Sequence, residues 1–423
     1  MKTIYNHLIL TGLVGLLTVN LVLAQNEVPV QTQRSANAKI TNLAPTPPMG
    51  WNSWNTFQTR IDEKLLRDMV DTYVSTGMRD AGYKYFTLDD GWMAMNRDQN
   101  GQLVADPKKF PSGMKAFADY VHGKGLKFGI YNCAGDKTCA GYPGTRGHEY
   151  EDARLYASWG VDLLKYDWCN TDSLNAREAY ITMARALQAT GRPILFSLCE
   201  WGNHQPWLWA NGVGEMYRAT GDITANFDKD KHMGTWTALS VLTIVDKQPA
   251  IRQYNGPNHW NDPDMLEVGN GMTFAEDKAH FTMWCMLAAP LVAGNDLRKM
   301  SGQTKTILTN KDVIAINQDG LGIAAYRNSS ENGLDVWVKP LSNGKWAVCF
   351  LNRSDKAQDV TYNWANNPLK DSFSKRTAVF NDAVYRLRYV WERKEASTTK
   401  SDFKTSIPAH DVVLLLLTPN GAK

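Results

Sequence analysis

The feature that most constrains the fold is a short apolar run that ends abruptly in an acid. The clearest example is residues 163–170, which read Leu-Leu-Lys-Tyr-Asp-Trp-Cys-Asn. The run begins like a buried strand, and Asp167 stands where that strand would leave the core, two residues after Lys165. In a parallel (β/α) barrel the chemistry gathers at the C-terminal ends of the strands. Taken alone, Asp167 would also fit a structural ion pair, so the repetition of the pattern along the chain decides between the two interpretations.

Strand-like and helical segments alternate through the first three quarters of the chain. The strand-like runs are residues 48–54, 83–88, 126–131, 161–166, 193–198, 215–218, 258–260 and 291–293. The helical segments are 62–77, 112–123, 149–159, 173–190 and 274–288, and a further helical region follows Asp222. This alternation predicts an α/β fold, a (β/α)8 TIM barrel over residues 45–325. A doubly wound sheet is the alternative, but no Gly-x-Gly-x-x-Gly follows the first strand.

The pattern of predicted elements changes from about residue 321, where the alternation of strands and helices ends. Short β runs occur at 336–338, 346–351, 360–364 and 412–417, separated by Asn, Gly, Ser, Asp and Pro. This pattern predicts a C-terminal antiparallel β-sandwich domain over residues 326–423. The segment has no cluster of candidate catalytic acids, so we expect it to contribute packing, with weak sugar binding as the alternative.

The first 24 residues have the pattern of a secretory signal peptide. Lys2 supplies the positive start, residues 8–23 are largely apolar, and Val22-Leu23-Ala24 fits a cleavage site before Gln25. Residues 25–44 read as a polar N-terminal arm. No other run approaches the eighteen apolar residues of a membrane span, and a net charge of +3 does not suggest nucleic acid or membranes as partners. We therefore expect an exported protein, secreted or periplasmic.

Candidate functional residues gather at the ends of the predicted strands. They are Trp51 and Trp54, Asp89 and Asp90, Tyr131, Lys165 and Asp167, Glu200 and Trp201, Asp222 just past Arg218, and Asp264. A structural network would explain one or two of these acids, but not so many at the same end of successive strands. We interpret the group as an active site.

Five ordered motifs carry a family resemblance. They are Met49-Gly50-Trp51-Asn52-Ser53-Trp54, Leu88-Asp89-Asp90-Gly91-Trp92, Leu164-Lys165-Tyr166-Asp167, Cys199-Glu200-Trp201 and Trp260-Asn261-Asp262-Pro263-Asp264-Met265. They resemble glycoside hydrolase family 27, the melibiase-type α-galactosidases. The resemblance spans the barrel and implies a retaining exo-glycosidase that needs no cofactor or metal, with a C-terminal antiparallel β domain. It implies Asp167 as the nucleophile and Asp222, in Arg218-Ala219-Thr220-Gly221-Asp222, as the acid/base.

The physical logic of retention agrees with this assignment. One carboxyl attacks the anomeric carbon while a second, about 5–5.5 Å away, protonates the departing oxygen. We expect Lys165 to hold Asp167 ionised. Asp222 must start protonated, so we expect it in a poorly solvated place.

The resemblance also implies the sugar-binding residues. Asp89 and Asp90 would accept hydrogen bonds from O4 and O6 of galactose. An isolated Asp-Asp-Gly would instead be interpreted as a turn. Lys165, Arg218 and Asp264 would bind the remaining hydroxyls. The cavity wall would consist of Trp54, Tyr131 and Trp201, with Cys199 beside them.

The choice of sugar depends on the loop Cys199-Glu200-Trp201. A charged residue and a large ring would crowd an N-acetyl group and bond a free 2-hydroxyl, so we expect α-D-galactosides to be preferred over α-N-acetylgalactosaminides. The Asp89-Asp90 pair would favour a sugar with O6 over β-L-arabinopyranosides. The sequence does not distinguish an oligosaccharide, a polysaccharide or a glycoconjugate as the substrate, and it leaves the oligomeric state open.

Two hypotheses from other classes compete with this interpretation. A non-catalytic sugar-binding barrel is disfavoured because both Asp167 and Asp222 are present. A metal-dependent hydrolase is disfavoured because the eight His include no ligand-spaced pair and the six Cys form no Cys-x-x-Cys.

The cysteines suggest one disulfide. Cys139 and Cys169 fall in the loops after adjacent predicted strands, and export permits a bridge between them. The states of Cys133, Cys199, Cys285 and Cys349 stay open. Three features depart from the family pattern: Cys133 itself, the absence of a partner for Cys199 in the next eighty residues, and Arg388 in Arg388-Tyr389-Val390-Trp391, where relatives tend to carry an Asp before the Trp.

Overall fold

The computed structural model describes residues 42–421. The predicted signal peptide (1–24) and all but the last three residues of the predicted arm (25–44) lie outside the described residues, so both stay predictions. Within residues 42–421, no helix combines the length and the apolar character that crossing a bilayer requires.

Eight parallel strands form the barrel, as predicted. They are β1 (Met49–Asn52), β2 (Tyr85–Thr87), β3 (Lys127–Cys133), β4 (Leu163–Asp167), β5 (Leu195–Cys199), β6 (Met216–Arg218), β9 (Trp260–Asp262) and β10 (Leu291–Ala293). Their order in the sheet is β10-β1-β2-β3-β4-β5-β6-β9. Most of their residues are buried on both faces, which is why these runs are apolar without alternation.

The ring closes between β9 and β10 just beyond the end of β9. Leu266 forms a parallel bridge with Ala293, and its amide donates to the Val292 carbonyl at 2.7 Å. Pro263 has no amide hydrogen to donate, and Asp264 has a φ of +91°. Strand β9 is therefore interrupted before it pairs with β10. At this interruption the Asp264 carboxylate lies against Arg218 of the neighbouring strand β6.

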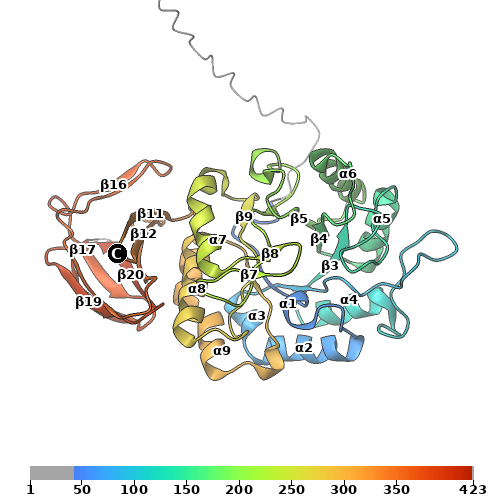
Figure 1. Cartoon of the computed structure of the whole chain (residues 1–423), viewed down its shortest axis with the longest axis horizontal. Helices are drawn as coiled ribbons and strands as arrows, with labels where there is room; N and C mark the ends of the chain where they lie inside the picture. Colours follow the sequence, from blue (N-terminus) through green and yellow to red (C-terminus); the bar gives the residue numbers. More distant parts are fainter. Residues whose placement is uncertain (1–41, 422–423) are drawn as a thin grey trace, which may run out of the picture. The chain divides into compact units, whose positions relative to one another are not determined.

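Helices surround the strand ring (Figure 1). The α-helices are α1 (Trp54–Phe57), α2 (Glu63–Ser75), α3 (Met78–Ala81), α4 (Gly113–Gly123), α5 (Glu149–Trp159), α6 (Ala176–Ala189), α7 (Val241–Lys247), α8 (Phe274–Met286), α9 (Gly302–Leu308) and α10 (Lys311–Asn317). The 3-10 turns are η1 (Pro206–Leu208), η2 (Gln248–Tyr254) and η3 (Leu297–Lys299). Side-chain caps define several starts, for example the reciprocal capping box of Thr273 and Glu276 on α8.

A small hairpin, which the sequence patterns do not predict, lies in the long loop after β6. Its strands are β7 (Lys231–His232) and β8 (Thr237–Ala238), paired antiparallel. The Met233 amide donates to the Trp236 carbonyl at 2.8 Å, and Gly234 takes a φ of +86° in the two-residue turn between them. Except for Ala238, all residues of the hairpin are exposed.

The C-terminal segment is an antiparallel β-sandwich, as predicted. Its strands are β11 (Tyr326–Glu331), β12 (Leu334–Pro340), β13 (Trp346–Asn352), β14 (Gln358–Tyr362), β15 (Leu369–Asp371), β16 (Arg376–Ala378), β17 (Tyr385–Tyr389), β18 (Lys394–Thr398), β19 (Phe403–Ile407) and β20 (Val412–Pro419). Six of them form one sheet in the order β11-β12-β13-β20-β17-β18, and β14 with β19 and β15 with β16 form pairs. The predicted division at residues 325 and 326 stays a prediction.

Buried polar contacts join barrel residues to sandwich residues. Lys339 of β12 donates to the carbonyl of Cys285 in α8 at 3.1 Å, and Arg252 of η2 forms an ion pair with Asp371 of β15. Both partners of the ion pair are buried, Asp371 fully. An unpaired charge at either position would be costly, so these contacts fix the two packed surfaces against each other.

Candidate active site

One large cavity opens at the C-terminal ends of the barrel strands, with a volume of about 920 Å³. The predicted site residues that line it are Trp54, Asp89, Tyr131, Lys165, Asp167, Cys199, Trp201, Arg218, Asp222 and Asp264. The structure therefore brings together residues from seven different strand ends. Asp90 and Glu200 are not among the lining residues.

Asp167 is the last residue of β4 and is buried in the sheet. In the register of the sheet it is the partner of Cys133 in β3 and of Cys199 in β5. Its carboxylate accepts a hydrogen bond from the Trp168 amide at 2.9 Å. Burial raises the pKa of Asp167 to about 6; the Lys165 cation opposes this rise, and the Asp222 charge adds to it. Lys165 lowers the pKa of Asp167, as expected, but burial has the larger effect. That Lys165 holds Asp167 ionised as a nucleophile stays a prediction.

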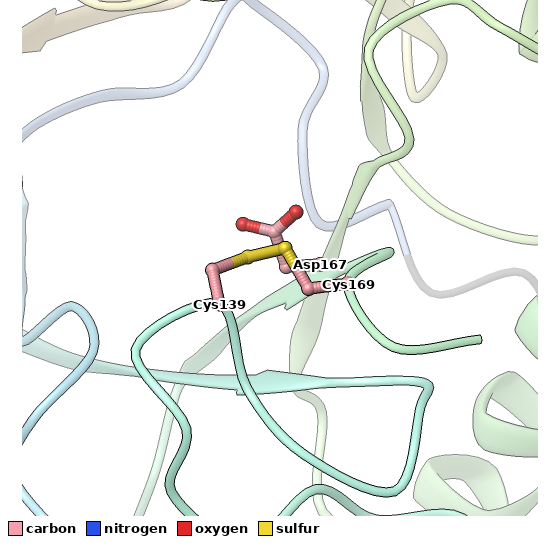
Figure 2. Close-up of side chains that lie close together, drawn as sticks. All are labelled: Cys139, Asp167 and Cys169. Carbon is pink, nitrogen blue, oxygen red and sulfur yellow. A yellow bond between two sulfur atoms is a disulfide. The ribbon is translucent and has the colours of Figure 1, made fainter. Parts of the chain in front are cut away.

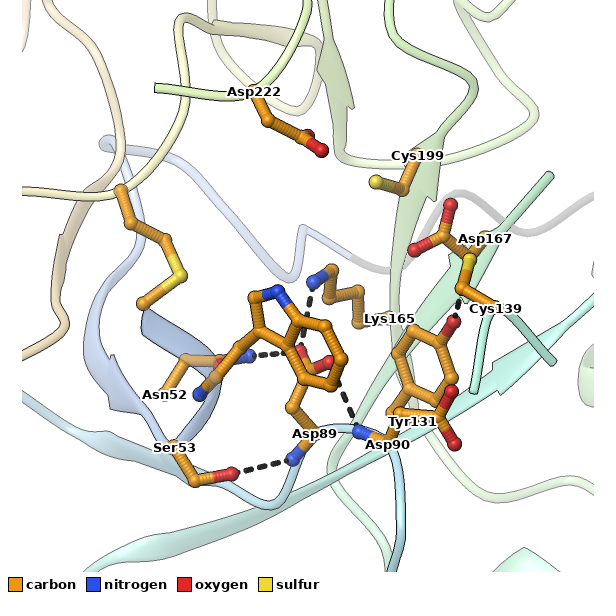
Figure 3. A network of polar contacts seen from close by, with 12 residues as sticks. Asn52, Ser53, Asp89, Asp90, Tyr131, Cys139, Lys165, Asp167, Cys199 and Asp222 are labelled. Atoms are coloured by element: carbon orange, nitrogen blue, oxygen red, sulfur yellow. Dashed lines mark hydrogen bonds and ion pairs between the residues drawn. The ribbon is translucent and has the colours of Figure 1, made fainter. Parts of the chain in front are cut away.

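Lys165 and Asp89 form the charged floor of the cavity (Figure 3). The Lys165 ammonium lies 2.7 Å from Asp89 Oδ2, and Asn52 donates to the same oxygen at 2.7 Å. The Asp89 amide in turn donates to Ser53 Oγ at 3.0 Å. Burial is the largest single influence on the pKa of Lys165 and lowers it, but the charges around the ammonium, with Asp89 first and Asp167 also contributing, together raise it. The motif around Asn52 and Ser53 thus fixes Asp89 and its cation in place at the cavity.

Arg218, at the end of β6, joins two acids. It lies 2.9 Å from Asp222 Oδ1 and 2.8 Å from Asp264 Oδ2. Asp264 is buried, whereas the Asp222 side chain is 43% exposed. The expectation of a poorly solvated Asp222 is therefore wrong: this carboxyl is partly exposed to solvent and is held by a buried cation.

Asp90 and Glu200 have other partners. Asp90 accepts from the Gly91 and Ala140 amides at 2.8 and 2.9 Å, and burial raises its pKa to about 6. Glu200 is fully buried and accepts from the amide and ring Nδ1 of His204 at 2.5 and 2.8 Å. Glu200 is buried and does not line the cavity, so its contact with the sugar stays a prediction.

The loop after β5 makes a sharp turn directly after Glu200. Trp201 adopts a φ of +59°, which is unusual for a bulky side chain. The next residue, Gly202, passes so close to β6 that an added Cβ would lie 2.6 Å from the Ala219 carbonyl oxygen. This sharp turn presents the Trp201 ring to the cavity.

The predicted disulfide between Cys139 and Cys169 is present beside the carboxyl of Asp167 (Figure 2). Tyr131 donates its hydroxyl to Cys139 Sγ at 3.3 Å, and the Cys133 thiol donates to the Cys169 carbonyl at 3.0 Å. The other four cysteines are free and buried. Burial raises the pKa of both Cys133 and Cys199, so these thiols stay protonated next to the acids.

Two groups of described residues have the composition of a metal site. One is Cys139, Asp167 and Cys169, whose sulfur atoms are already joined to each other. The other is Asp228, Asp355 and His410, whose ring already contacts Glu276 and Asp355. The first group offers no thiolate, and the second is not part of the cavity lining.

Family comparisons agree with this arrangement. Residues 46–319 match the family model described as alpha galactosidase A, and residues 331–417 match the alpha galactosidase C-terminal beta sandwich domain. The chain belongs to the α-galactosidase family of glycoside hydrolases. This is the family 27 assignment that the motifs indicate.

Relatives in this family cover nearly the whole chain. An alpha-galactosidase A from Cellvibrio japonicus is 53% identical over 92% of this chain and 96% of its own length. The crystal structure of alpha-galactosidase I from Mortierella vinacea superposes with a TM-score of 0.83 at 36% identity, covering 90% of this chain and 99% of its own. The α-galactosidase of Saccharomyces cerevisiae, solved with raffinose, gives a TM-score of 0.82 at 31% identity, covering 89% and 98%.

Several lining residues of this family member are absent from the sequence-based prediction. Met233 and Trp236 of the hairpin, Asn203 of the β5 loop and Glu267 after β9 all contribute to the cavity wall. Glu267 has a sequence signal, because it follows the Asp264 motif by three residues. The hairpin residues have none, because their position depends on how a long irregular loop folds back over the barrel.

Proposed function

We propose that this chain is a retaining exo-α-galactosidase that removes terminal α-D-galactosyl residues. The observation that carries the proposal is the pair of acids from β4 and β6, which face one cavity in different surroundings. Asp167 is buried and tied to its own strand, whereas Asp222 is solvent-exposed and held by Arg218. Two carboxyls in unlike environments are what a nucleophile and an acid/base require.

In the first step, the ionised carboxylate of Asp167 attacks the anomeric carbon of the bound galactoside. The proton of Asp222 passes to the glycosidic oxygen as the bond to the leaving group breaks. A bound sugar would cover Asp222 and exclude water from this proton transfer. Arg218 keeps this carboxyl in position throughout.

In the second step, the covalent galactosyl ester on Asp167 is hydrolysed. Asp222, which has given up its proton in the first step, removes a proton from the attacking water, and its contact with Arg218 keeps the carboxylate in position. Two inversions at the anomeric carbon give α-galactose, so the configuration is retained.

Polar groups on the cavity floor support recognition of a galactosyl residue. The Asp89–Lys165 pair offers an acceptor and a donor to the sugar hydroxyls, and hydrogen bonds to charged groups are the stronger kind, about 1.5–3 kcal/mol each. The proposed preference for a galactoside over an N-acetylgalactosaminide rests on Trp201, Cys199 and Arg218, which line the cavity. Glu200, which does not line it, is not used in this argument. The relative from Saccharomyces cerevisiae solved with raffinose supports oligosaccharides as substrates.

We also propose that the chain is exported. The pattern of residues 1–24 supports cleavage before Gln25, and the disulfide at the cavity wall fits an oxidising compartment. N-terminal sequencing of the protein from the producing cell's exterior should begin at Gln25. A product that retains residues 1–24 would contradict export by this route.

Matched aryl glycosides test the activity and the sugar preference together. The values of kcat/KM should be highest for the α-D-galactoside and far lower for the α-N-acetylgalactosaminide and the β-L-arabinopyranoside. Asp167→Ala is the inactive control. Equal or better turnover of either alternative sugar would contradict the proposed specificity.

A further inference from the structure

The hairpin β7–β8 turns its two largest apolar side chains to the catalytic cavity. Met233 and Trp236 flank the two-residue turn, so they lie opposite each other and project from the same face of the hairpin. Both line the cavity that holds Asp167 and Asp222. They remain 43% and 46% exposed, so a large part of each side chain is free to contact a ligand.

The base of the hairpin is bonded to the segment that carries Asp222. The Leu239 amide donates to the Asp222 carbonyl at 2.7 Å, and the Thr224 amide donates to the Leu239 carbonyl at 2.9 Å. The Ser240 amide also donates to the Asp230 side chain at 2.7 Å, which ties the two ends of the hairpin together. An isolated hairpin of this length would be unstable in water, so these contacts hold it beside the acid/base.

This attachment determines which part of a substrate the hairpin meets. Asp222 protonates the oxygen that leaves with the aglycone, so the leaving group must pass on its side of the cavity. The galactosyl residue lies deeper, over the Asp89–Lys165 floor. A cavity of about 920 Å³ is at the upper end of the range for drug-sized ligands and has room beyond one sugar ring.

From these observations we propose that the hairpin forms a binding subsite for the leaving group, where Trp236 stacks on the first sugar ring of the aglycone. One pyranose face presents C–H groups to the flat ring, and Met233 widens the apolar surface. Asn203, Thr224 and Thr237 line the same region and offer polar atoms to the ring hydroxyls. One aromatic platform among polar groups fits a neutral sugar better than a lipid chain, which would need a continuous apolar surface.

The proposal rests on the proposed function and makes the enzyme selective for galactosides with a sugar as leaving group. It is tested by the ratio of kcat/KM for melibiose to kcat/KM for α-galactosyl fluoride, because fluoride is too small to reach the hairpin. In Trp236→Ala this ratio should fall about tenfold, the size of one aromatic stacking contact. Trp236→Phe should keep most of the wild-type ratio.

Tyr150→Ala is the matched control, since Tyr150 is an aromatic side chain of similar exposure (45%) outside the cavity. Its ratio should equal that of the wild type. An unchanged ratio in Trp236→Ala, or an equal fall in Tyr150→Ala, would overturn the subsite and leave the proposed function standing. Failure of the wild-type protein to hydrolyse α-galactosyl fluoride at all would instead overturn the proposed function.

Discussion

Asp167 and Asp222 differ most in how the protein surrounds them. Asp167 is fixed by its strand and by the Trp168 amide, whereas Asp222 is held at the cavity wall by an arginine that is itself buried. The sequence places both acids at strand ends but does not reveal their solvation. Solvation depends on which side chains from other strands pack around each carboxyl.

Removing the proton donor should affect substrates according to their leaving group. In Asp222→Asn, kcat/KM for melibiose should fall by about 10²–10⁴, the usual contribution of a general acid. The value for α-galactosyl fluoride should fall far less, because fluoride needs little protonation to leave. Asp228→Asn, an exposed acid outside the cavity lining, is the control. A uniform loss on both substrates would contradict the role of Asp222.

The buried nucleophile should set the acidic limb of the pH profile. Asp167 must be ionised to attack, and burial raises its pKa to about 6. The value of kcat/KM should therefore fall about tenfold per pH unit below pH 6 and be independent of this group above it. Lys165→Gln removes the cation that opposes the rise, so the limb should move to higher pH. A shift of the acidic limb to lower pH in Lys165→Gln would contradict this effect of the Lys165 cation.

At the level of elements, the strand ends position the candidate catalytic acids, and the loops supply much of the cavity wall. Most barrel strands were predictable because they are buried apolar runs. The polar strand β9, Trp260-Asn261-Asp262, overlaps the expected run 258–260 only at Trp260. The loops were less predictable: the loop after β5 turns through a left-handed backbone at Trp201, and the β7–β8 hairpin forms by pairing within a polar loop. Neither feature has an apolar period that sequence patterns detect.

The bridge between Cys139 and Cys169 should stabilise the loops after β3 and β4. The two residues are 30 apart in sequence, so the chain-entropy model gives about 3.5 kcal/mol. The double variant Cys139→Ser/Cys169→Ser should lower the free energy of unfolding by about 2–4 kcal/mol in denaturant titrations. Reductant should destabilise the wild type by a similar amount and leave the double variant unchanged. If reductant destabilised both equally, another thiol group would be responsible.

At the scale of the whole molecule, the barrel was easier to predict than the sandwich. The expected runs at 336–338, 346–351 and 412–417 lie inside β12, β13 and β20, the apolar strands of the larger sheet. Strands such as β19 were missed because they bury only alternate residues, here Phe403 and Ile407, among polar ones. Their pairing partners, which are distant in sequence, determine that they form strands at all.

The buried ion pair between Arg252 and Asp371 should matter for the stability of the whole chain. Arg252→Met leaves the Asp371 charge buried without its partner, which costs about 3–5 kcal/mol. Thermal unfolding followed by calorimetry should show a clear drop in melting temperature. Arg298→Met, which breaks the partly exposed pair with Asp296, should change stability by about 1 kcal/mol or less. Equal effects of the two substitutions would contradict this account of the interface.

The most direct test of the central claim is the stereochemistry of chemical rescue at Asp167. Asp167→Ala should lose turnover while keeping its fold by circular dichroism, because the side chain supplies the attacking atom. Added azide should enter the vacated place, restore activity on an aryl α-galactoside and give a product whose anomeric configuration NMR can assign. The account predicts β-galactosyl azide, formed by a single inversion. An α-configured azide, or full activity of Asp167→Ala without azide, would contradict the assignment of Asp167 as the nucleophile.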